Sequence, residues 1–172
     1  DRDYVEASNL QRQMLFDEAD AAESLPKAIA AARKIAAFNS RVVVEPRIAD
    51  LIPGNIEVLL EGTQLLLDGT DNFETRYLIN DFAVSRSLPW IYTAAVGSYG
   101  VSMNVLTGKT ACLACLFPTP PQGMVATCDT SGILNSAVNW AASIAATAAT
   151  KILVGAEDRL RLRALDHRDA RR

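Results

Sequence analysis

The stretch "QLLLDGTDNFETRYLINDFAVSRS", residues 64–87, decides the fold. Its run Leu65–Leu67 is apolar without interruption, which is typical of a strand buried on both faces of a parallel sheet. A helical pattern follows after a short polar loop, and Asp71 and Glu74 stand at the spacing of a capping box. A buried strand that leads through a polar loop into a helix is the repeating unit of an α/β sheet.

The alternation of strands and helices continues on both sides of this stretch. We expect, in chain order, a helix over 24–40, a strand over 41–46 ("RVVVEP"), a short helix over 54–62, strands over 89–96 and 101–106 separated by a turn at 97–100, a long alanine-rich helix within 133–155, and an edge strand over 159–165 ("RLRLRAL"). This order predicts a Rossmann-like, doubly wound α/β fold. Its mainly parallel sheet is expected to have a C-terminal antiparallel portion.

At 172 residues the chain has the length of about one domain. It begins with two aspartates at a point where a strand should already have ended, and it stops in the charged segment "DHRDARR". We therefore expect a single domain over 1–172 that is truncated at both ends and lacks its N-terminal βα unit.

The composition excludes two classes of partner. A net charge of −3 gives no reason to expect nucleic-acid binding. The long apolar run at 133–155 contains Asn135 and Asn139, whose amides would be costly in lipid, so a buried helix is expected and no membrane span. No signal-like segment opens the sequence, and its three cysteines are too unevenly placed for a disulfide framework. A reduced, cytoplasmic setting is therefore expected.

Three loops are expected at the carboxyl ends of strands, where open α/β sheets bind their ligands: "DRDYVEASNLQRQ" (1–13), "DGTDNFETR" (68–76) and "AAVGSYG" (94–100). Asp1 stands where a Rossmann-type unit places its ribose-binding acid, although an exposed terminal aspartate is the simpler interpretation. Asp71 is either the N-cap of its helix or a Mg²⁺ ligand that faces bound phosphates, and the two roles are compatible.

Two cations stand near helix starts, where the helix dipole disfavours positive charge. Lys27 lies in the first turn of its expected helix, and Arg76 lies in the first turn or two of the next long helix. A solvated surface lysine is one interpretation of this placement. The other is an anion bound between the two cations, because helix N-termini attract phosphate.

The cysteines leave several chemistries open. Cys112 and Cys115 form a C-x-x-C motif, which is half of a tetrahedral zinc site or a redox pair. The loop that follows the motif, "FPTPPQG", disfavours the redox interpretation. Cys128 precedes an expected helix start and is either an activated nucleophile or an inert buried thiol. His167, the sole histidine, lies in a charged tail, so no mechanism with a histidine base is supported.

Five motifs follow one another from residue 1 to about residue 155: "DRDYVEASNLQRQ", "PKAIAAARKIAAFN", "LLLDGTDNFETRYLIND", "CLACLFPTPP" and "TCDTSGIL". Together they resemble the MoeB/ThiF/HesA adenylyltransferases, bacterial relatives of ubiquitin-activating enzymes. The resemblance implies a ThiF-type domain that adenylates the C-terminal Gly-Gly carboxylate of a ubiquitin-like sulfur-carrier protein and releases pyrophosphate. Carriers of molybdopterin synthesis and of thiamine synthesis both fit.

The resemblance also implies roles for residues around ATP. Asp1 matches the acid that holds the ribose hydroxyls, and Lys27 matches the lysine on the phosphates. Asp71 matches the Mg²⁺ carboxylate, with Asn72 beside it. The residues that match the phosphate-contacting motif are Ser8, Asn9, Gln11 and Arg12.

For the cysteines, the resemblance implies a structural zinc ion and a covalent step. Cys112 and Cys115 match the first half of a Cys₄ zinc site, and Cys128 matches a cysteine that some members link to the carrier or its sulfur. A sulfur-donor protein and a homodimer are implied as partners. The family's glycine-rich loop, an N-terminal arginine and a second C-x-x-C are not in this sequence, so this fragment alone is expected to be inactive and poor in zinc.

Two other functions are the alternatives. A non-catalytic family member would only dock a ubiquitin-like partner, but Arg12, Lys27 and Asp71 argue for catalysis. A dinucleotide-dependent oxidoreductase would share the Rossmann-like half of the chain, yet it has no need of "SNLQRQ" or of the C-x-x-C motif.

Overall fold

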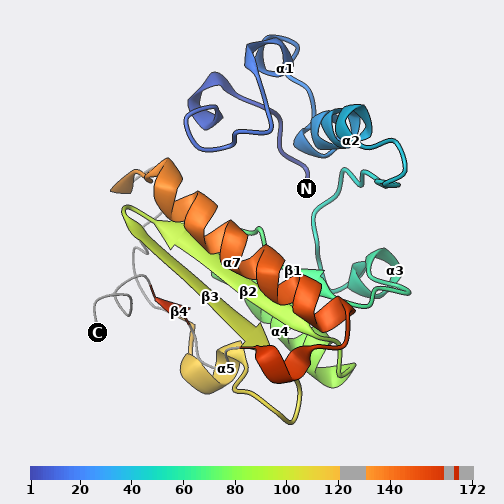
Figure 1. The fold of residues 1–172 in the computed structure, drawn as a ribbon, viewed down its shortest axis with the longest axis vertical. Coiled ribbons are helices and arrows are strands. Elements are labelled where there is room, and N and C mark those ends of the chain that lie inside the picture. Colours follow the sequence, from blue (N-terminus) through green and yellow to red (C-terminus); the bar gives the residue numbers. More distant parts are fainter. Residues whose placement is uncertain (121–130, 161–164, 167–172) are drawn as a thin grey trace. The chain divides into compact units, whose positions relative to one another are not determined.

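The computed structural model describes residues 1–120, 131–160 and 165–166. The chain divides into two compact units, Asp1–Leu51 and Ile52–Arg172, and each is described by itself. Figure 1 shows their elements coloured along the sequence from blue to red.

The first unit contains one short 3-10 helix and two α-helices: η1 (Ala7–Asn9), α1 (Glu18–Ala22) and α2 (Lys27–Phe38). A capping box starts α1, in which Asp17 and Asp20 each accept a hydrogen bond from the other's backbone N–H. Pro26 precedes α2, and the helix expected over 24–40 is confirmed with a start at Lys27.

The strand expected over 41–46 is wrong. Residues 43–51 follow a turn and have no regular secondary structure, and Val42 and Val43 are exposed. A strand is stable only when a neighbouring strand satisfies its backbone N–H and C=O groups. The described residues of the first unit contain no other strand, so a β-branched run has nothing to pair with there.

The second unit is built on a four-stranded sheet in the order β1-β2-β3-β4. The strands are β1 (Leu66–Leu67), β2 (Trp90–Val96), β3 (Tyr99–Val105) and β4 (Leu165–Asp166). β1 and β2 are parallel, whereas β2 with β3 and β3 with β4 are antiparallel. The α/β class and the C-terminal antiparallel portion are thereby confirmed.

Helices pack on both faces of this sheet (Figure 1). α7 (Asn135–Leu153) and α4 (Phe73–Ser85) contact its strands, and the unit also contains α3 (Ile56–Leu59), α5 (Leu113–Leu116) and η2 (Glu157–Arg159). Ile91 of β2 packs in a buried cluster with Ala145 and Ala149 of α7. The next residue, Tyr92, faces Arg76 of α4. Because consecutive strand residues point to opposite faces, α7 and α4 cover opposite sides of β2.

The long helix α7 approaches the sheet closely because small residues line the contact. A Cβ atom on Gly100 of β3 would lie 3.0 Å from the Ala137 carbonyl oxygen and 3.2 Å from the Trp140 ring. Ala141 and Ala145 of α7 are buried. The expected buried, alanine-rich helix is confirmed. Among the described residues, no helix combines the length and the hydropathy of a membrane span.

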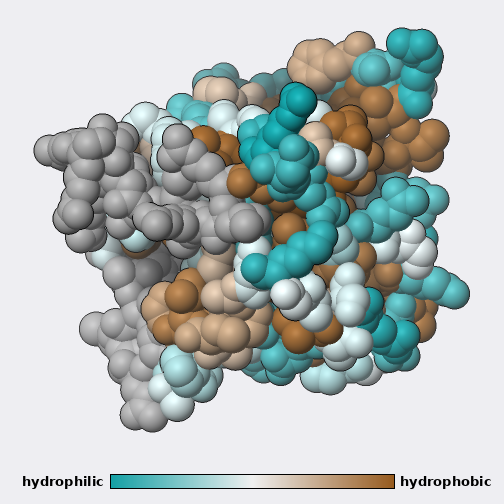
Figure 2. All heavy atoms as spheres, turned by 60° about the horizontal axis from the view of Figure 1, so that its bottom comes forward, coloured by the Kyte–Doolittle hydropathy of each residue, from teal (hydrophilic) through white to brown (hydrophobic). Residues whose placement is uncertain are grey.

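Apolar side chains also reach the surface. Figure 2 shows brown apolar atoms interspersed with teal polar atoms on the face that it displays. Phe38 and Val43 in the first unit and Val58 and Val154 in the second are each more than two-thirds exposed. Single exposed apolar side chains are ordinary on folded proteins and carry no functional argument.

Candidate active site

In the first unit, the start of the chain runs antiparallel to the start of α2. The backbone N–H of Val5 donates to the Leu25 carbonyl at 2.8 Å, and that of Lys27 donates to the Asp3 carbonyl at 2.8 Å. This pairing places the first loop against the first turn of α2. Two predicted site residues, Asp1 and Lys27, therefore come from adjoining segments.

Asp3 connects these two predicted residues. Its backbone N–H donates to the Asp1 carboxylate at 2.9 Å, and its own carboxylate accepts from the Lys27 ammonium at 3.1 Å. The Lys27 side chain is 16% exposed, so the interpretation as a solvated surface lysine is wrong. Sequence reasoning missed Asp3, although its D-x-D spacing from Asp1 was a signal.

The segment "SNLQRQ" forms η1 and the turn after it. Asn9 is buried, and its side-chain oxygen accepts from the Glu6 backbone N–H at 3.3 Å. The Arg12 guanidinium donates to the Ser8 carbonyl at 3.0 Å, which closes the turn. Ser8 and Gln11 are exposed, so the buried Asn9 side chain stabilises the turn while these neighbours face solvent.

In the second unit, the N-cap of α4 is Asn72, whose side-chain oxygen accepts from the Thr75 backbone N–H at 2.8 Å. The expectation that Asp71 caps this helix in a box with Glu74 is therefore wrong by one residue. Asp71 is exposed, and its carboxylate contacts the Asn72 amide at 3.4 Å. Among the described residues it forms no ion pair, so it is open to a cation.

Arg76 does not face a ligand site. Its side chain is 8% exposed and pairs with Asp68, whose side chain is fully buried, at 3.3 Å between Nε and Oδ2. Burial raises the pKa of the Asp68 carboxyl, and the charge of Arg76 and the hydrogen bonds from Thr70 oppose this rise. The anion that Arg76 was expected to bind is therefore the Asp68 carboxylate of the chain itself.

Two of the three predicted loops lie at one edge of the sheet. The loop 68–72 follows β1, and the hairpin turn at Gly97 and Ser98 follows β2. Because β1 and β2 are parallel, their carboxyl ends point the same way. The third loop, 1–13, belongs to the first unit.

The cysteine pair lies on a short turn at the start of α5. The sulfur atoms of Cys112 and Cys115 are 3.4 Å apart. In a tetrahedral site with Zn–S bonds of about 2.3 Å, two sulfurs lie somewhat less than about 4 Å apart, so the pair fits half of such a site. Among the described residues, no group of three or more Cys, His, Asp or Glu side chains completes it.

Helix α4 holds this cysteine turn in place. The Asn80 side-chain oxygen accepts from the Leu113 backbone N–H at 2.8 Å, and the Tyr77 hydroxyl donates to the Phe117 carbonyl. Burial opposes ionisation of Cys112, but hydrogen bonds from Cys115, from the backbone and from Asn80 together lower the pKa of its thiol. Cys128 and His167 lie outside the described residues.

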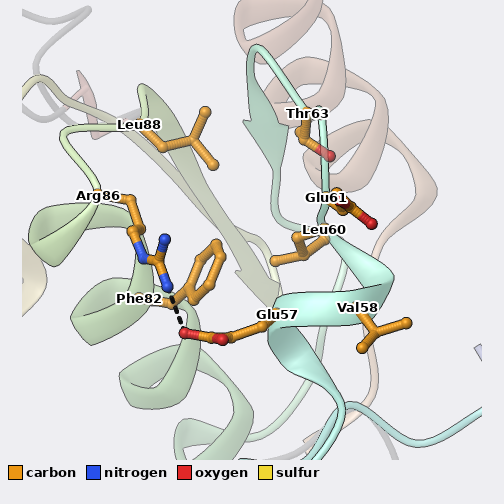
Figure 3. A pocket seen from close by; sticks show the side chains of 9 residues that line it. Glu57, Val58, Leu60, Glu61, Thr63, Phe82, Arg86 and Leu88 are labelled. Carbon is orange, nitrogen blue, oxygen red and sulfur yellow. Dashed lines mark hydrogen bonds and ion pairs between the residues drawn. The ribbon is translucent and has the colours of Figure 1, made fainter.

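A groove of about 550 Å³ is lined by none of the predicted site residues (Figure 3). Its lining includes an ion pair between Arg86, near the end of α4, and Glu57 of α3. Thr63 and Leu88 also line it, and they precede β1 and β2. The groove is therefore at the amino ends of these strands, opposite the edge where ligands of such sheets bind.

Comparison with known proteins gives one family. The model of the ThiF family matches residues 1–170. The chain is 46% identical over 166 residues to the sulfur carrier protein ThiS adenylyltransferase of Bacillus subtilis, covering 96% of this chain and 49% of the relative. It is 36% identical over 155 residues to the SAMP-activating enzyme E1 of Haloferax volcanii, covering 90% of this chain and 56% of the relative.

The fold has counterparts among solved structures. A crystal structure of E. coli MccB with ATP superposes with a TM-score of 0.79 at 20% identity, over 96% of this chain and 50% of MccB. At this identity the likeness concerns the fold. The chain spans about half the length of these curated relatives.

Proposed function

The chain belongs to the ThiF family, and from this premise we propose that it carries out ATP-dependent adenylation of a ubiquitin-like sulfur-carrier protein. The likeness to the Bacillus subtilis enzyme, which is named for its action on the carrier ThiS, carries this proposal. Identity to that relative is higher than to the archaeal one, so a ThiS-type carrier is the first substrate to test.

The reaction joins two anions. A carboxylate oxygen of the carrier's C-terminal glycine attacks the α-phosphorus of ATP and forms a new P–O bond. The bond from that phosphorus to the bridging oxygen breaks, and pyrophosphate leaves with the electron pair. The carboxylate is already deprotonated, so the step needs positioning and charge neutralisation more than a general base.

Residues of the first unit would supply the positive charge. Lys27 and Arg12 carry the positive charges proposed for the phosphates, and Asp1 carries the acceptors proposed for the ribose hydroxyls. Ser8, Asn9 and Gln11 belong to the same phosphate-side turn. The Lys27 ammonium donates to the Asp3 carboxylate at 3.1 Å, and phosphate oxygens would take the place of that carboxylate when ATP binds.

A magnesium ion is part of the proposal. Asp71, with Asn72 beside it, would hold Mg²⁺, and its exposed carboxylate without an ion-pair partner among the described residues supports this role. When bound, Mg²⁺ neutralises phosphate charge.

The proposal also covers the cysteines, the partners and the domain. Cys112 and Cys115 would hold half of a structural zinc site, supported by the approach of their sulfurs. Cys128 would form the covalent link to the carrier or its sulfur. A homodimer, a sulfur-donor protein and a cytoplasmic setting complete the proposal. The family match over 1–170 supports one ThiF-type domain over 1–172.

Exchange of labelled pyrophosphate into ATP tests the proposed function. In the full-length protein we expect exchange that depends on a ThiS-type carrier. Arg12→Ala and Asp71→Ala should each reduce it by about 100-fold, the size of effect that follows loss of one preorganised electrostatic contact. Arg33→Ala on α2 and Asp81→Ala on α4, which change exposed residues of the same charge types, should leave it within about twofold.

Two results would sink the proposal. Folded full-length protein that shows no exchange with any ubiquitin-like carrier tested would exclude adenylation. Binding of the carrier without exchange would instead identify the non-catalytic docking alternative. Exchange that survives in both Arg12→Ala and Asp71→Ala would show that these motifs do not form the site.

A further inference from the structure

Two buried charged side chains, Asp68 and Arg76, enclose the residue that precedes Asp71. Asp68 directly follows β1, which ends at Leu67, and Arg76 lies in the first turn of α4. Their side chains are 0% and 8% exposed. A buried charge is retained in a fold only when it is paired and hydrogen-bonded, so their contacts indicate what they do.

Every polar group of Thr70 is held by this pair. The Asp68 carboxylate accepts from the Thr70 backbone N–H at 2.8 Å and from its hydroxyl at 2.7 Å. The Arg76 guanidinium donates to the Thr70 carbonyl. The next residue, Asp71, is exposed. The backbone on one side of Asp71 is thus fixed by buried contacts while its carboxylate stays open.

The backbone on the other side of Asp71 is fixed as well. Asn72 caps α4 through its bond from the Thr75 N–H at 2.8 Å. Asp71 is therefore the one residue between two anchored neighbours, so the point from which its side chain extends is fixed on both sides.

Arg76 is itself held by more than its charge. Its guanidinium carbon lies 5.6 Å from the centre of the Phe73 ring and 5.3 Å from that of Tyr92. Planar stacking and a forked donor set are properties of arginine that lysine lacks. A lysine at this position would carry the charge without keeping both the stacking and the bond to Thr70.

We propose that Asp68 and Arg76 are positioning residues that preorganise the Asp71 carboxylate for the metal of Mg·ATP. The inference rests on the proposed function for the identity of the ligand. The contacts that fix the loop lie within the chain and need no ligand, so they can be measured in the protein without nucleotide.

Two variants test the inference in the full-length protein. Asp68→Asn removes the negative charge that pairs with the Arg76 guanidinium. Arg76→Lys keeps the positive charge but removes the several N–H donors of the guanidinium and its stacking on Phe73 and Tyr92. Without nucleotide, the Thr70 amide should exchange hydrogen about tenfold faster in each variant, which corresponds to loss of about one hydrogen bond. In the pyrophosphate exchange assay, half-maximal activity should require about tenfold more Mg²⁺, and saturating Mg²⁺ should restore most of the rate.

A control and a milder pair of variants keep the test decisive. Glu57→Gln removes the exposed ion pair with Arg86 at the other end of α4 and should change neither measurement. If Asp68→Asn or Arg76→Lys does not fold, Thr70→Val removes only the hydroxyl contact and should show the same two changes more weakly. Thr70→Ser keeps a hydroxyl and should behave like the wild type in both measurements.

Unchanged Thr70 amide exchange in folded variants would overturn the inference. An equal loss of activity at every Mg²⁺ concentration would also overturn it, because that is the result of a purely structural role. If the wild-type protein shows no pyrophosphate exchange, the proposed function fails, and the amide measurement still decides whether the pair fixes the loop.

Discussion

At the scale of single residues, the site is defined by which charges are already paired within the chain. Lys27 is paired with Asp3, and Arg76 with Asp68, whereas Asp71 has no ion-pair partner among the described residues. The Asp3 side of the Lys27–Asp3 pair is exposed, so a ligand can replace Asp3 as the partner of Lys27. The buried pair is structural. Two cations near helix starts therefore have different roles.

Lys27 and Lys34 lie on the same helix and provide a matched comparison. Lys27→Ala should reduce pyrophosphate exchange per folded molecule by at least tenfold, because the charge proposed for the phosphates is lost. Lys34 pairs with Asp17 and with buried Asp20. Lys34→Ala should lower the melting temperature and leave exchange per folded molecule unchanged. Equal loss of exchange in both variants, corrected for folded protein, would contradict this assignment.

Asp17 gives the first unit a pH dependence. The hydrogen bond from Lys34, and next the one from the Asp20 backbone, hold the pKa of Asp17 below its ordinary value of 3.8. The unfolded chain then binds this proton more readily than the folded chain does. The contribution of Asp17 is present above about pH 4 and is lost as the pH falls through the lowered pKa.

Asp17→Asn isolates this contribution. Asparagine keeps the N-cap of α1 but does not titrate. Urea unfolding followed at several pH values from about 6 down to 2 should show a smaller acid loss of stability in the variant than in the wild type. Parallel curves for the two proteins would show that Asp17 does not carry the effect.

At the scale of elements, α4 supports the candidate site with its first turn and its middle. Its first turn carries the cap Asn72 and the buried Arg76, and its middle holds the cysteine turn through Asn80. Its last turns line the groove at the opposite edge of the sheet. A single helix thus supports the loop proposed for metal and the turn proposed for zinc.

Asn80 provides the test of this support. Asn80→Ala leaves the Leu113 N–H buried without its partner, which costs about 1–3 kcal/mol. The cysteine turn should loosen, and the zinc affinity of the full-length protein, measured by competition with a chelator, should fall by about tenfold or more. Glu74→Gln, at an exposed position of the same helix, is the control. Unchanged zinc affinity in Asn80→Ala would separate this helix from the cysteine site.

The contact between β3 and α7 depends on the absence of a side chain at Gly100. Gly100→Ala places a Cβ atom 3.0 Å from backbone and should destabilise the second unit by about 1–3 kcal/mol. At Gly54 the new Cβ would meet only the end of Ile52 at 3.9 Å, so Gly54→Ala should be nearly neutral. Urea denaturation of the two variants compares them directly. Equal stabilities would mean that the sheet and α7 are less closely packed than described.

The sequence predicts elements well where their signals are local. The helices α2, α4 and α7 and the hairpin of β2 and β3 follow from spacing, turn residues and apolar pattern. The strand expected over 41–46 failed because pairing is a property of two segments, and one segment's composition does not reveal whether a partner is present. An N-cap at Asp71 or at Asn72 could not be distinguished, because both residue types cap well.

For the candidate site, the sequence predicts residue types, and the contacts among them come from the folded structure. Asp1, Arg12, Lys27 and Asp71 were identified from motifs. The roles of Asp3, Asp68 and Arg76 were not, because they depend on which side chains meet after folding. The Asp68–Arg76 pair joins the end of a strand to a helix across an irregular loop. Such a loop has no repeating apolar pattern from which its contacts could be predicted.

At the scale of the whole molecule, the proposed function draws on both units. The first contributes the residues proposed for the ribose and the phosphates, and the second contributes the proposed metal ligand and the cysteine pair. With a net charge of −3, the chain has no large excess of positive charge to attract an anionic ligand, so local placement of cations has to provide affinity for ATP.

The most direct test of the central claim is pyrophosphate exchange by the full-length protein with two versions of one carrier. A ThiS-type carrier with its C-terminal Gly-Gly should support exchange of labelled pyrophosphate into ATP, and the same carrier without its last glycine should not. Absence of exchange with the intact carrier and with every other ubiquitin-like carrier, or equal exchange with the intact and truncated versions, would contradict adenylation of the terminal carboxylate.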